Sequence, residues 1–200
     1  MIRVLVADDE DLIRGALVAL LELEEDLTVV ASTGDAEEAV ELAAEHRPDV
    51  CVLDLEMPPT DGVVAAAAIR RRVRARTLIV TRHARPGVLR RALREGVNGF
   101  APKSMPAEQL ARVIRDVARG KRYVDPEIAA SALTGEKCPL SDRELDVLRV
   151  GRDGARISVI AAELHLAEGT VRNHVSSILA KIGVETRHEA ARIAWENGWI

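Results

Sequence analysis

The first 120 residues alternate between short apolar runs and longer amphipathic stretches. The apolar runs have the length of β-strands, and the stretches between them repeat apolar residues at helical spacing. This alternation predicts an α/β domain, a doubly wound parallel sheet with helices on both faces. The predicted strands are 2–7, 27–32, 49–54, 77–81 and 97–101, and the predicted helices are 10–24, 35–46, 62–73, 86–95 and 106–119.

The pattern changes after Gly120. Residues 121–138 mix charged residues with Pro126 and Gly135 and contain one short helical piece, which indicates a connector between domains. No strand pattern follows, so an all-α domain is predicted for 139–200. Its helices are 141–152, 157–164, 168–182 and 187–196, and Ser141 with Glu144 has the spacing of a capping box. The second and third of these helices fit a helix-turn-helix.

Composition limits where any DNA contact can lie. The net charge is −4, and residues 121–200 hold 11 basic and 12 acidic residues, hence −1. Bulk charge therefore does not predict nucleic-acid binding, and DNA contacts must come from local placement of side chains.

No stretch has the ~18 uncharged apolar residues of a membrane span. With no signal peptide expected either, the sequence predicts a cytoplasmic protein without membrane insertion.

Carboxylates follow two apolar runs where parallel strands should end. Asp54 ends the run 49–54, and Asp8 and Asp9 directly follow the run 2–7. The carboxyl ends of parallel strands meet at one edge of the sheet, where open α/β folds bind ligands. Neighbouring carboxylates repel each other unless a cation separates them, and Mg²⁺ prefers oxygen ligands. The pattern predicts a Mg²⁺ site around an aspartate that can accept a phosphoryl group.

Two further side chains at strand ends complete this predicted site. Thr81 ends the fourth strand and Lys103 follows the fifth. A hydroxyl and an ammonium group can both bind the oxygens of a phosphoryl group. Singly, Thr81 is explained as a strand-end residue and Lys103 as a solvated charge. Their joint occurrence at successive strand ends favours the functional interpretation.

Several short motifs resemble those of one bacterial family. Val6-Ala7-Asp8-Asp9-Glu10, Leu53-Asp54-Leu55-Glu56-Met57-Pro58, Asp61-Gly62, Val80-Thr81 and Phe100-Ala101-Pro102-Lys103 resemble the flavodoxin-like receiver domain of response regulators. Residues 139–144 and 168–178 resemble the LuxR-type helix-turn-helix. The whole chain resembles a NarL/FixJ regulator, most closely the DesR-like branch, with a receiver domain at 1–120, a linker at 121–138 and a DNA-binding domain at 139–200.

The resemblance implies a role for each matching residue. Asp54 would be the phosphoacceptor, Lys103 would pair with the phosphoryl group, and Thr81 with Phe100 would form the switch pair, the ring moving inward after the hydroxyl. The implied Mg²⁺ ligands are Asp8, Asp9, Asp54 and the carbonyl of Glu56.

Three positions depart from the family pattern. Phe100 stands where tyrosine is commoner, Pro102 precedes Lys103 where a proline more often follows, and Arg82 follows Thr81 where small residues are usual. An arginine there could narrow access to Asp54 or bind phosphate itself. These departures bear on the rate of phosphorylation more than on its site.

The predicted recognition helix 168–182 presents polar residues near its start. Arg172 suits guanine and Asn173 suits adenine, each through two hydrogen bonds, and Ser176 shares their surface. Thr170 and Lys181 are predicted to contact phosphates. The apolar face of the last helix, with Ile193 and Trp195, is predicted to serve partly as core and partly as a dimer contact.

The function predicted is that of a two-component response regulator. A sensor histidine kinase would phosphorylate it, and it would bind double-stranded promoter DNA as a phosphorylation-promoted homodimer. One alternative is an orphan regulator whose DNA binding is independent of phosphate. A second is a phosphohydrolase with Asp54 as nucleophile, which Glu56 disfavours because haloacid-dehalogenase-type enzymes carry aspartate at that spacing.

Overall fold

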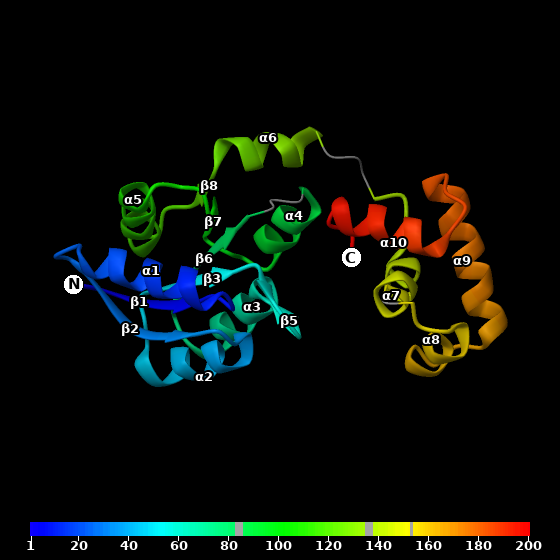
Figure 1. Cartoon of the computed structure of the whole chain (residues 1–200), viewed down its shortest axis with the longest axis horizontal. Coiled ribbons are helices and arrows are strands. Elements are labelled where there is room, and N and C mark those ends of the chain that lie inside the picture. Colours follow the sequence, from blue (N-terminus) through cyan, green and yellow to red (C-terminus); the bar gives the residue numbers. More distant parts are fainter. Residues whose placement is uncertain (83–85, 135–137, 153) are drawn as a thin grey trace. The chain divides into compact units, whose positions relative to one another are not determined.

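The computed structural model describes residues 1–82, 86–134, 138–152 and 154–200. The chain forms two compact units, one comprising most of residues 1–132 and the other residues 133–200. Figure 1 labels their helices and strands, and each unit is described by itself.

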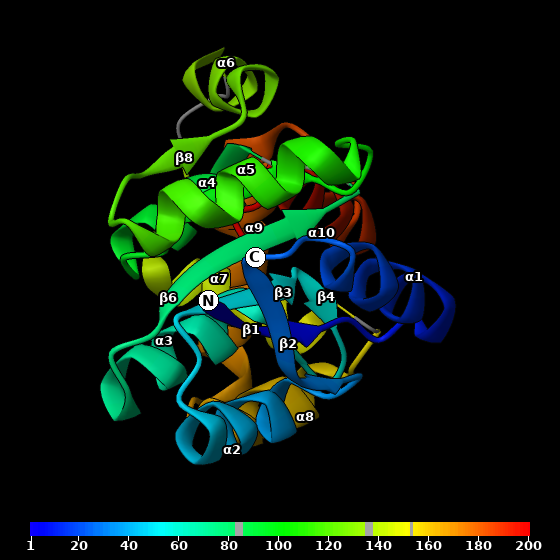
Figure 2. The same cartoon turned by 90° about the vertical axis from the view of Figure 1, so that its left-hand side faces the viewer.

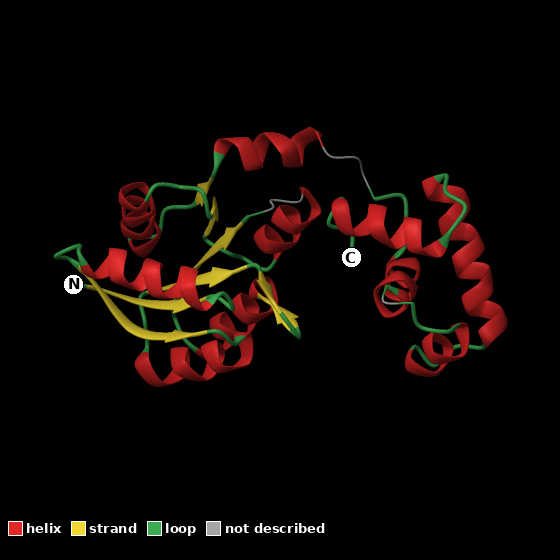
Figure 3. Ribbon diagram, viewed as in Figure 1, coloured by secondary structure: helices red, strands yellow, loops and turns green. Residues whose placement is uncertain are grey.

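The first unit is built on a parallel sheet, whose strands are yellow in Figure 3. The strand order is β2-β1-β3-β6-β7-β8. This order places β1 and β3 side by side in the middle of the sheet although a strand and two helices separate them in the chain. The strands are β1 (Ile2–Ala7), β2 (Leu27–Thr33), β3 (Val50–Asp54), β6 (Arg76–Thr81), β7 (Gly99–Pro102) and β8 (Tyr123–Val124). A small antiparallel hairpin, β4 (Glu56–Met57) and β5 (Thr60–Asp61), follows β3.

Helices cover both faces of this sheet (Figure 2). Alternate strand residues such as Val4, Val52 and Leu78 form one core with α1 and α5, while their neighbours Leu5 and Leu53 are fully buried and point the opposite way. Burial on both faces explains why these strands are continuous apolar runs. The helices are α1 (Asp11–Glu22), α2 (Ala36–His46), α3 (Gly62–Arg72), α4 (Pro86–Arg94), α5 (Ala107–Ala118) and α6 (Pro126–Thr134).

The predicted doubly wound sheet is confirmed, and three short strands were missed. Both β4 and β5 have two residues, too few to show a periodic pattern, and Pro58-Pro59 between them obscures the hairpin. The third, β8, lies in the segment predicted as linker and pairs with Gly99 and Phe100. The predicted domain limits at 120/121 and 138/139 stay predictions.

The second unit consists of α7 (Asp142–Gly151), α8 (Ile157–Glu163), α9 (Glu168–Ile182) and α10 (Arg187–Glu196) around one apolar core. The predicted capping box is confirmed, since Ser141 and Glu144 cap the start of α7 reciprocally. Gly183 ends α9 in the left-handed conformation at φ 77°. Across the described ranges, every helix is too short or too polar to cross a bilayer.

Candidate phosphorylation site and DNA-contact helix

Four predicted site residues meet at the carboxyl edge of the sheet. Asp54 and Thr81 are the last residues of β3 and β6. Asp8 directly follows β1, and Lys103 directly follows β7. Because these strands are parallel and adjacent, their ends lie together. Asp8 and Asp54 are only 1% and 3% exposed, so this edge holds two nearly buried carboxylates.

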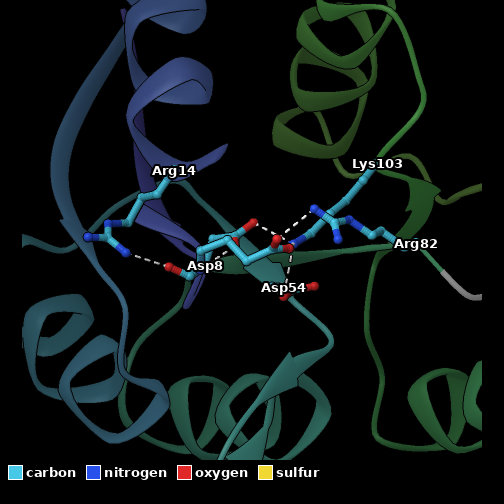
Figure 4. Close-up of polar contacts among 6 residues, drawn as sticks. Asp8, Arg14, Asp54, Arg82 and Lys103 are labelled. Atoms are coloured by element: carbon cyan, nitrogen blue, oxygen red, sulfur yellow. Dashed lines mark hydrogen bonds and ion pairs between the residues drawn. The ribbon is translucent and has the colours of Figure 1, made fainter. Parts of the chain in front are cut away.

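The ammonium group of Lys103 joins the carboxylates (Figure 4). Its Nζ lies 2.8 Å from Oδ2 of Asp8, 3.0 Å from Oδ2 of Asp54 and 3.1 Å from Oε1 of Glu10. The backbone N–H of Lys103 donates to the carbonyl of Thr81 at 2.8 Å, which fixes the start of the side chain. The preceding Pro102 therefore does not keep Lys103 away from Asp54.

The acidic residues at this edge fit a divalent cation. One carboxylate oxygen from each of Asp8, Asp9, Glu10 and Asp54 lies within 4.8 Å of the others. A compact set of carboxylate oxygens on rigid strand ends is the chemistry that Mg²⁺ prefers. Glu10 was not among the predicted ligands, although it belongs to the same acidic run. The ligand role of the Glu56 carbonyl stays a prediction.

Burial and charge act in opposite directions on Asp54. Burial raises the pKa of Asp54 to about 6, against the lowering effect of its hydrogen bond and ion pair with Lys103, while Asp8 raises it further. Burial lowers the pKa of Lys103, but hydrogen bonds to Asp8, Asp54 and Glu10 outweigh it, and the net shift is upward. The site therefore holds a costly buried carboxylate next to a firmly charged lysine.

A glycine permits the close packing behind Asp54. A Cβ atom on Gly62 would lie 1.9 Å from the carbonyl oxygen of Asp54, so no larger residue fits there. The N–H of Gly62 donates to the carbonyl of Leu55 at 3.0 Å. Asp61 caps α3 through the N–H groups of Val63 and Val64 at 2.9 Å each. These contacts explain the Asp61-Gly62 motif as the support that holds Asp54 in place.

The rim of the site carries one more ion pair. Arg82 Nη2 lies 2.6 Å from Oε2 of Glu10, whose other oxygen contacts Lys103. The Arg82 side chain is 54% exposed, and in Figure 4 it points toward the carboxylates of the site. The arginine predicted to affect access to Asp54 is thus linked to the site through Glu10, a residue missed from the sequence.

In the second unit, α8 and α9 form the predicted helix-turn-helix. His165 takes the left-handed conformation at φ 53° in the turn between them. Val171 and Ile178 of α9 are buried in the core. The four polar residues predicted to contact DNA near the start of α9, Thr170, Arg172, Asn173 and Ser176, are all exposed.

Comparison with known proteins identifies the family. Residues 4–115 match the response regulator receiver domain, and residues 138–194 match the luxR family of bacterial regulatory proteins. The chain is a two-component response regulator. Its receiver and LuxR-type domains place it in the NarL/FixJ family, whose standard mode is phosphorylation-dependent regulation of transcription.

Relatives cover this response regulator along its whole length. It is 41% identical to the transcriptional regulatory protein DesR of Bacillus subtilis, with all of both chains covered. It is 40% identical to the response regulator RamR of Streptomyces coelicolor, covering 100% of this chain and 98% of RamR. The crystal structure of ChrA, from a heme-sensing two-component system, matches with 29% identity and a TM-score of 0.60, covering 100% and 98% of the two chains. Such relatives mark the chain as a regulator and not an enzyme.

Lys181 of the regulator has a different partner from the predicted phosphate. Its Nζ lies 2.7 and 2.9 Å from the two carboxylate oxygens of Glu144, which is 3% exposed. Ser177 donates to the same carboxylate at 2.7 Å. The capping box thus extends across the core to α9. The Lys181 side chain remains 41% exposed and its ammonium has three N–H donors, so the phosphate contact stays a prediction.

The predicted dimer contacts on α10 are partly used within the domain. Ile193 packs against the apolar core, and Trp195 is half-buried beneath the guanidinium of Arg152, which lies 3.5 Å from the ring centroid. A dimer role for these two residues stays a prediction.

The aromatic switch residue already occupies an inward position. Phe100 is 1% exposed and pairs with Ile79 across β7 and β6, while Thr81 beside it is 2% exposed. The order of movement predicted for the hydroxyl and the ring stays a prediction. The switch role itself stays a prediction.

Proposed function

We propose that a sensor histidine kinase phosphorylates this response regulator on Asp54, and that the phosphorylated protein controls transcription at promoters bound by α9. One observation supports this assignment most strongly: the buried ammonium of Lys103 lies within 3.1 Å of Asp54, Asp8 and Glu10. A buried cation beside a carboxylate that can react is the arrangement required to hold a transferred phosphoryl group.

The proposed reaction is a phosphoryl transfer between two side chains. A carboxylate oxygen of Asp54 attacks phosphorus of the kinase phosphohistidine, the P–N bond breaks and the imidazole leaves with its electron pair. Lys103 orients Asp54 and pairs with the phosphoryl oxygens, and Thr81 donates its hydroxyl to them. Bound Mg²⁺, held by Asp8, Asp9, Asp54 and the Glu56 carbonyl, supplies charge compensation. Slow attack of water on the acyl phosphate would return free Asp54.

Labelling should therefore depend on Asp54. With acetyl phosphate and Mg²⁺, the parent should gain one acid-stable, hydroxylamine-sensitive phosphoryl group, and Asp54→Asn should gain none because the amide is not a nucleophile. Intact-mass measurement reports both, and Asp35→Asn, on a different strand end, serves as the control. A label retained on Asp54→Asn would assign the acceptor role to another carboxylate. A parent that accepts no phosphate from any donor would favour the orphan alternative.

For DNA, we propose that α9 enters the major groove with Arg172 and Asn173 on base edges and Thr170 and Ser176 beside them. Their shared exposed surface supports this role. Arg172 is paired with Glu168 at 2.7 Å, but this exposed i,i+4 pair is worth only ~0.5 kcal/mol and is easily exchanged for guanine.

Arg172→Ala should relax sequence preference at one base position of each half-site. The loss of a bidentate contact costs about 1–3 kcal/mol of discrimination. Selection from a randomised duplex library, with sequencing of bound fractions, would show that position becoming degenerate. Arg156→Ala, an exposed cation before α8, should leave the preference unchanged. An unaltered motif in Arg172→Ala would disprove the assignment of α9 as the base-reading helix.

We further propose that the protein acts in the cytoplasm and binds DNA as a homodimer that phosphorylation promotes, because a symmetric operator requires two copies. The receiver offers an apolar surface for this contact. Leu12 of α1 and Leu23 directly after it are 86% and 79% exposed, and Leu20 of α1, 44% exposed, lines a groove of about 270 Å³ between α1 and α5. Burying such leucines in a second copy would remove exposed apolar area from water.

A further inference from the structure

Five arginines lie within residues 70–76, from the last turn of α3 to the first residue of β6. They sit at the amino-terminal edge of the sheet, because β6 starts at Arg76 and ends at Thr81 beside the phosphorylation site. The cluster therefore lies at the opposite end of the strands from Asp54, and the function proposed above does not use it.

Four of these arginines, Arg70, Arg71, Arg72 and Arg74, line a hollow of about 760 Å³ together with Arg47, which follows α2. Arg72 forms an ion pair with Glu41, and Arg70 donates to the carbonyl of Glu95. Arg47, Arg71 and Arg74 are exposed, and their guanidinium groups form no hydrogen bond or ion pair in the part of the chain that the structure describes. One carboxylate, Asp49, also lines the hollow, and its Oδ2 accepts from the backbone N–H of Arg3 at 2.8 Å. The hollow thus carries three unpaired positive charges.

Helix stability explains only part of this cluster. Arg70, Arg71 and Arg72 lie in the last turn of α3, where cations interact favourably with the helix dipole by roughly 0.3–1 kcal/mol each. Arg47 and Arg74 lie outside that turn and add repulsion between like charges. A surface on which exposed cations outnumber carboxylates in this way is suited to an anionic ligand.

The helix-turn-helix, by contrast, has few cations for DNA phosphates. Residues 157–182 contain only two arginine or lysine residues, Arg172 and Lys181. Arg172 is assigned above to a base, and Lys181 is bound to buried Glu144. Affinity for the DNA backbone comes from cations that neutralise phosphates. Arg156, exposed directly before α8, is one more cation on this unit, whereas Arg47, Arg71 and Arg74 gather at a single hollow of the receiver domain.

We propose that the arginine surface formed by Arg47, Arg71 and Arg74 binds the phosphate backbone of DNA outside the bases that α9 contacts. The receiver is tethered to a domain already on the duplex, so a weak second contact occurs at high effective concentration. The surface adds affinity without sequence preference, since arginine–phosphate contacts carry no base information.

The test is the salt dependence of DNA binding by the full-length protein. Fluorescence anisotropy with a random-sequence duplex of about 40 base pairs, longer than two half-sites one turn apart, gives the dissociation constant at several salt concentrations. Each lost phosphate contact lowers the slope of log K against log salt by about 0.9. Arg71→Ala/Arg74→Ala should therefore lower it by about 2 and weaken binding several-fold at low salt.

A charge-matched variant separates this contact from a change in net charge. Arg112→Ala/Arg122→Ala removes two exposed arginines on the α5 side of the receiver and should keep the parental slope. Thermal unfolding confirms that all three proteins are folded. Equal slopes for the parent and Arg71→Ala/Arg74→Ala would overturn the proposal and leave the surface to an acidic protein partner. An equal decrease of the slope in both double variants would also overturn the proposal, since the change in net charge would then explain the weaker binding.

Discussion

Replacing Asp54 with asparagine should stabilise the metal-free receiver domain by about 2–3 kcal/mol at pH 7, because one pKa unit corresponds to ~1.4 kcal/mol. Asp54 is 3% exposed, and burial raises its pKa from 3.8 to about 6. Ionised Asp54 therefore costs the folded state free energy that an uncharged amide of similar shape does not. We expect the proposed phosphoacceptor to be a site where stability is sacrificed for reactivity.

The sign of the pH dependence follows from the raised pKa. Between pH 4 and 6 the unfolded chain has released the proton of Asp54 while the folded chain retains it. The stability of the parent therefore falls across this window as pH rises, and Asp54→Asn lacks this fall. The two proteins should be about equally stable near pH 4 and differ fully above pH 6.

Urea unfolding in EDTA, followed by far-ultraviolet circular dichroism, measures this difference. Glu25→Gln, an exposed carboxylate before β2, is the control and should match the parent. Added Mg²⁺ should stabilise the parent more than Asp54→Asn, because ligand bound only to the folded state raises its stability. If Asp54→Asn were less stable than the parent at pH 7 without metal, the buried charge would be net stabilising and the prediction wrong.

Replacing Glu144 with glutamine should have the opposite effect and destabilise the DNA-binding domain by about 3 kcal/mol. Burial raises the pKa of Glu144, but hydrogen bonds from Lys181, Ser177 and Ser141 outweigh it and hold the pKa near about 2. This carboxylate caps α7 and binds α9 at once. Its charge is compensated in the folded state and cannot be replaced by an amide.

The pH dependence is again set by the direction of the shift. The stability that Glu144 contributes is fully present above its unfolded pKa of 4.5 and is lost as pH falls toward 2. Tryptophan fluorescence reports on this domain alone, since Trp195 and Trp199 are the chain's two tryptophans. The parent should therefore be more stable than Glu144→Gln at pH 7, and the stabilities of the two proteins should become equal as the pH falls toward 2.

Glu168→Gln provides the matched control on α9. It removes the carboxylate that pairs with Arg172 on the exposed face and should cost at most ~0.5 kcal/mol. An equal loss of stability in Glu144→Gln and Glu168→Gln would show that the Glu144–Lys181 pair behaves as a surface ion pair. Lys181→Met should be at least as destabilising as Glu144→Gln, because it leaves the carboxylate buried without its cation.

The two buried carboxylates, Asp54 and Glu144, differ in how completely neighbouring groups compensate their charge. Asp54 has one strong cation, Lys103, which it shares with Asp8 and Glu10, so its charge is incompletely compensated. Glu144 has Lys181, Ser177 and Ser141 to itself. An incompletely compensated carboxylate gains from a new partner such as Mg²⁺ or a phosphoryl group, whereas a fully compensated one resists change.

The sequence alone determined the sheet and the residues at its carboxyl edge. Strands such as 49–54 are continuous apolar runs because both of their faces are buried, and parallel strands must end together, so Asp8, Asp54, Thr81 and Lys103 could be placed at one edge. Helix periodicity likewise placed Thr170, Arg172, Asn173 and Ser176 on the exposed side of α9.

Only the tertiary structure decided which partner each charged side chain has. Lys181 was predicted on a DNA phosphate and binds Glu144, a residue 37 positions away in the sequence. Glu10 joins Arg82 to Lys103, and Arg47 and Arg74, distant in the sequence, line the same hollow. Periodicity fixes the direction of a side chain relative to its own helix or strand. It does not fix which charge from a distant segment packs against it, because that depends on the docking of whole elements.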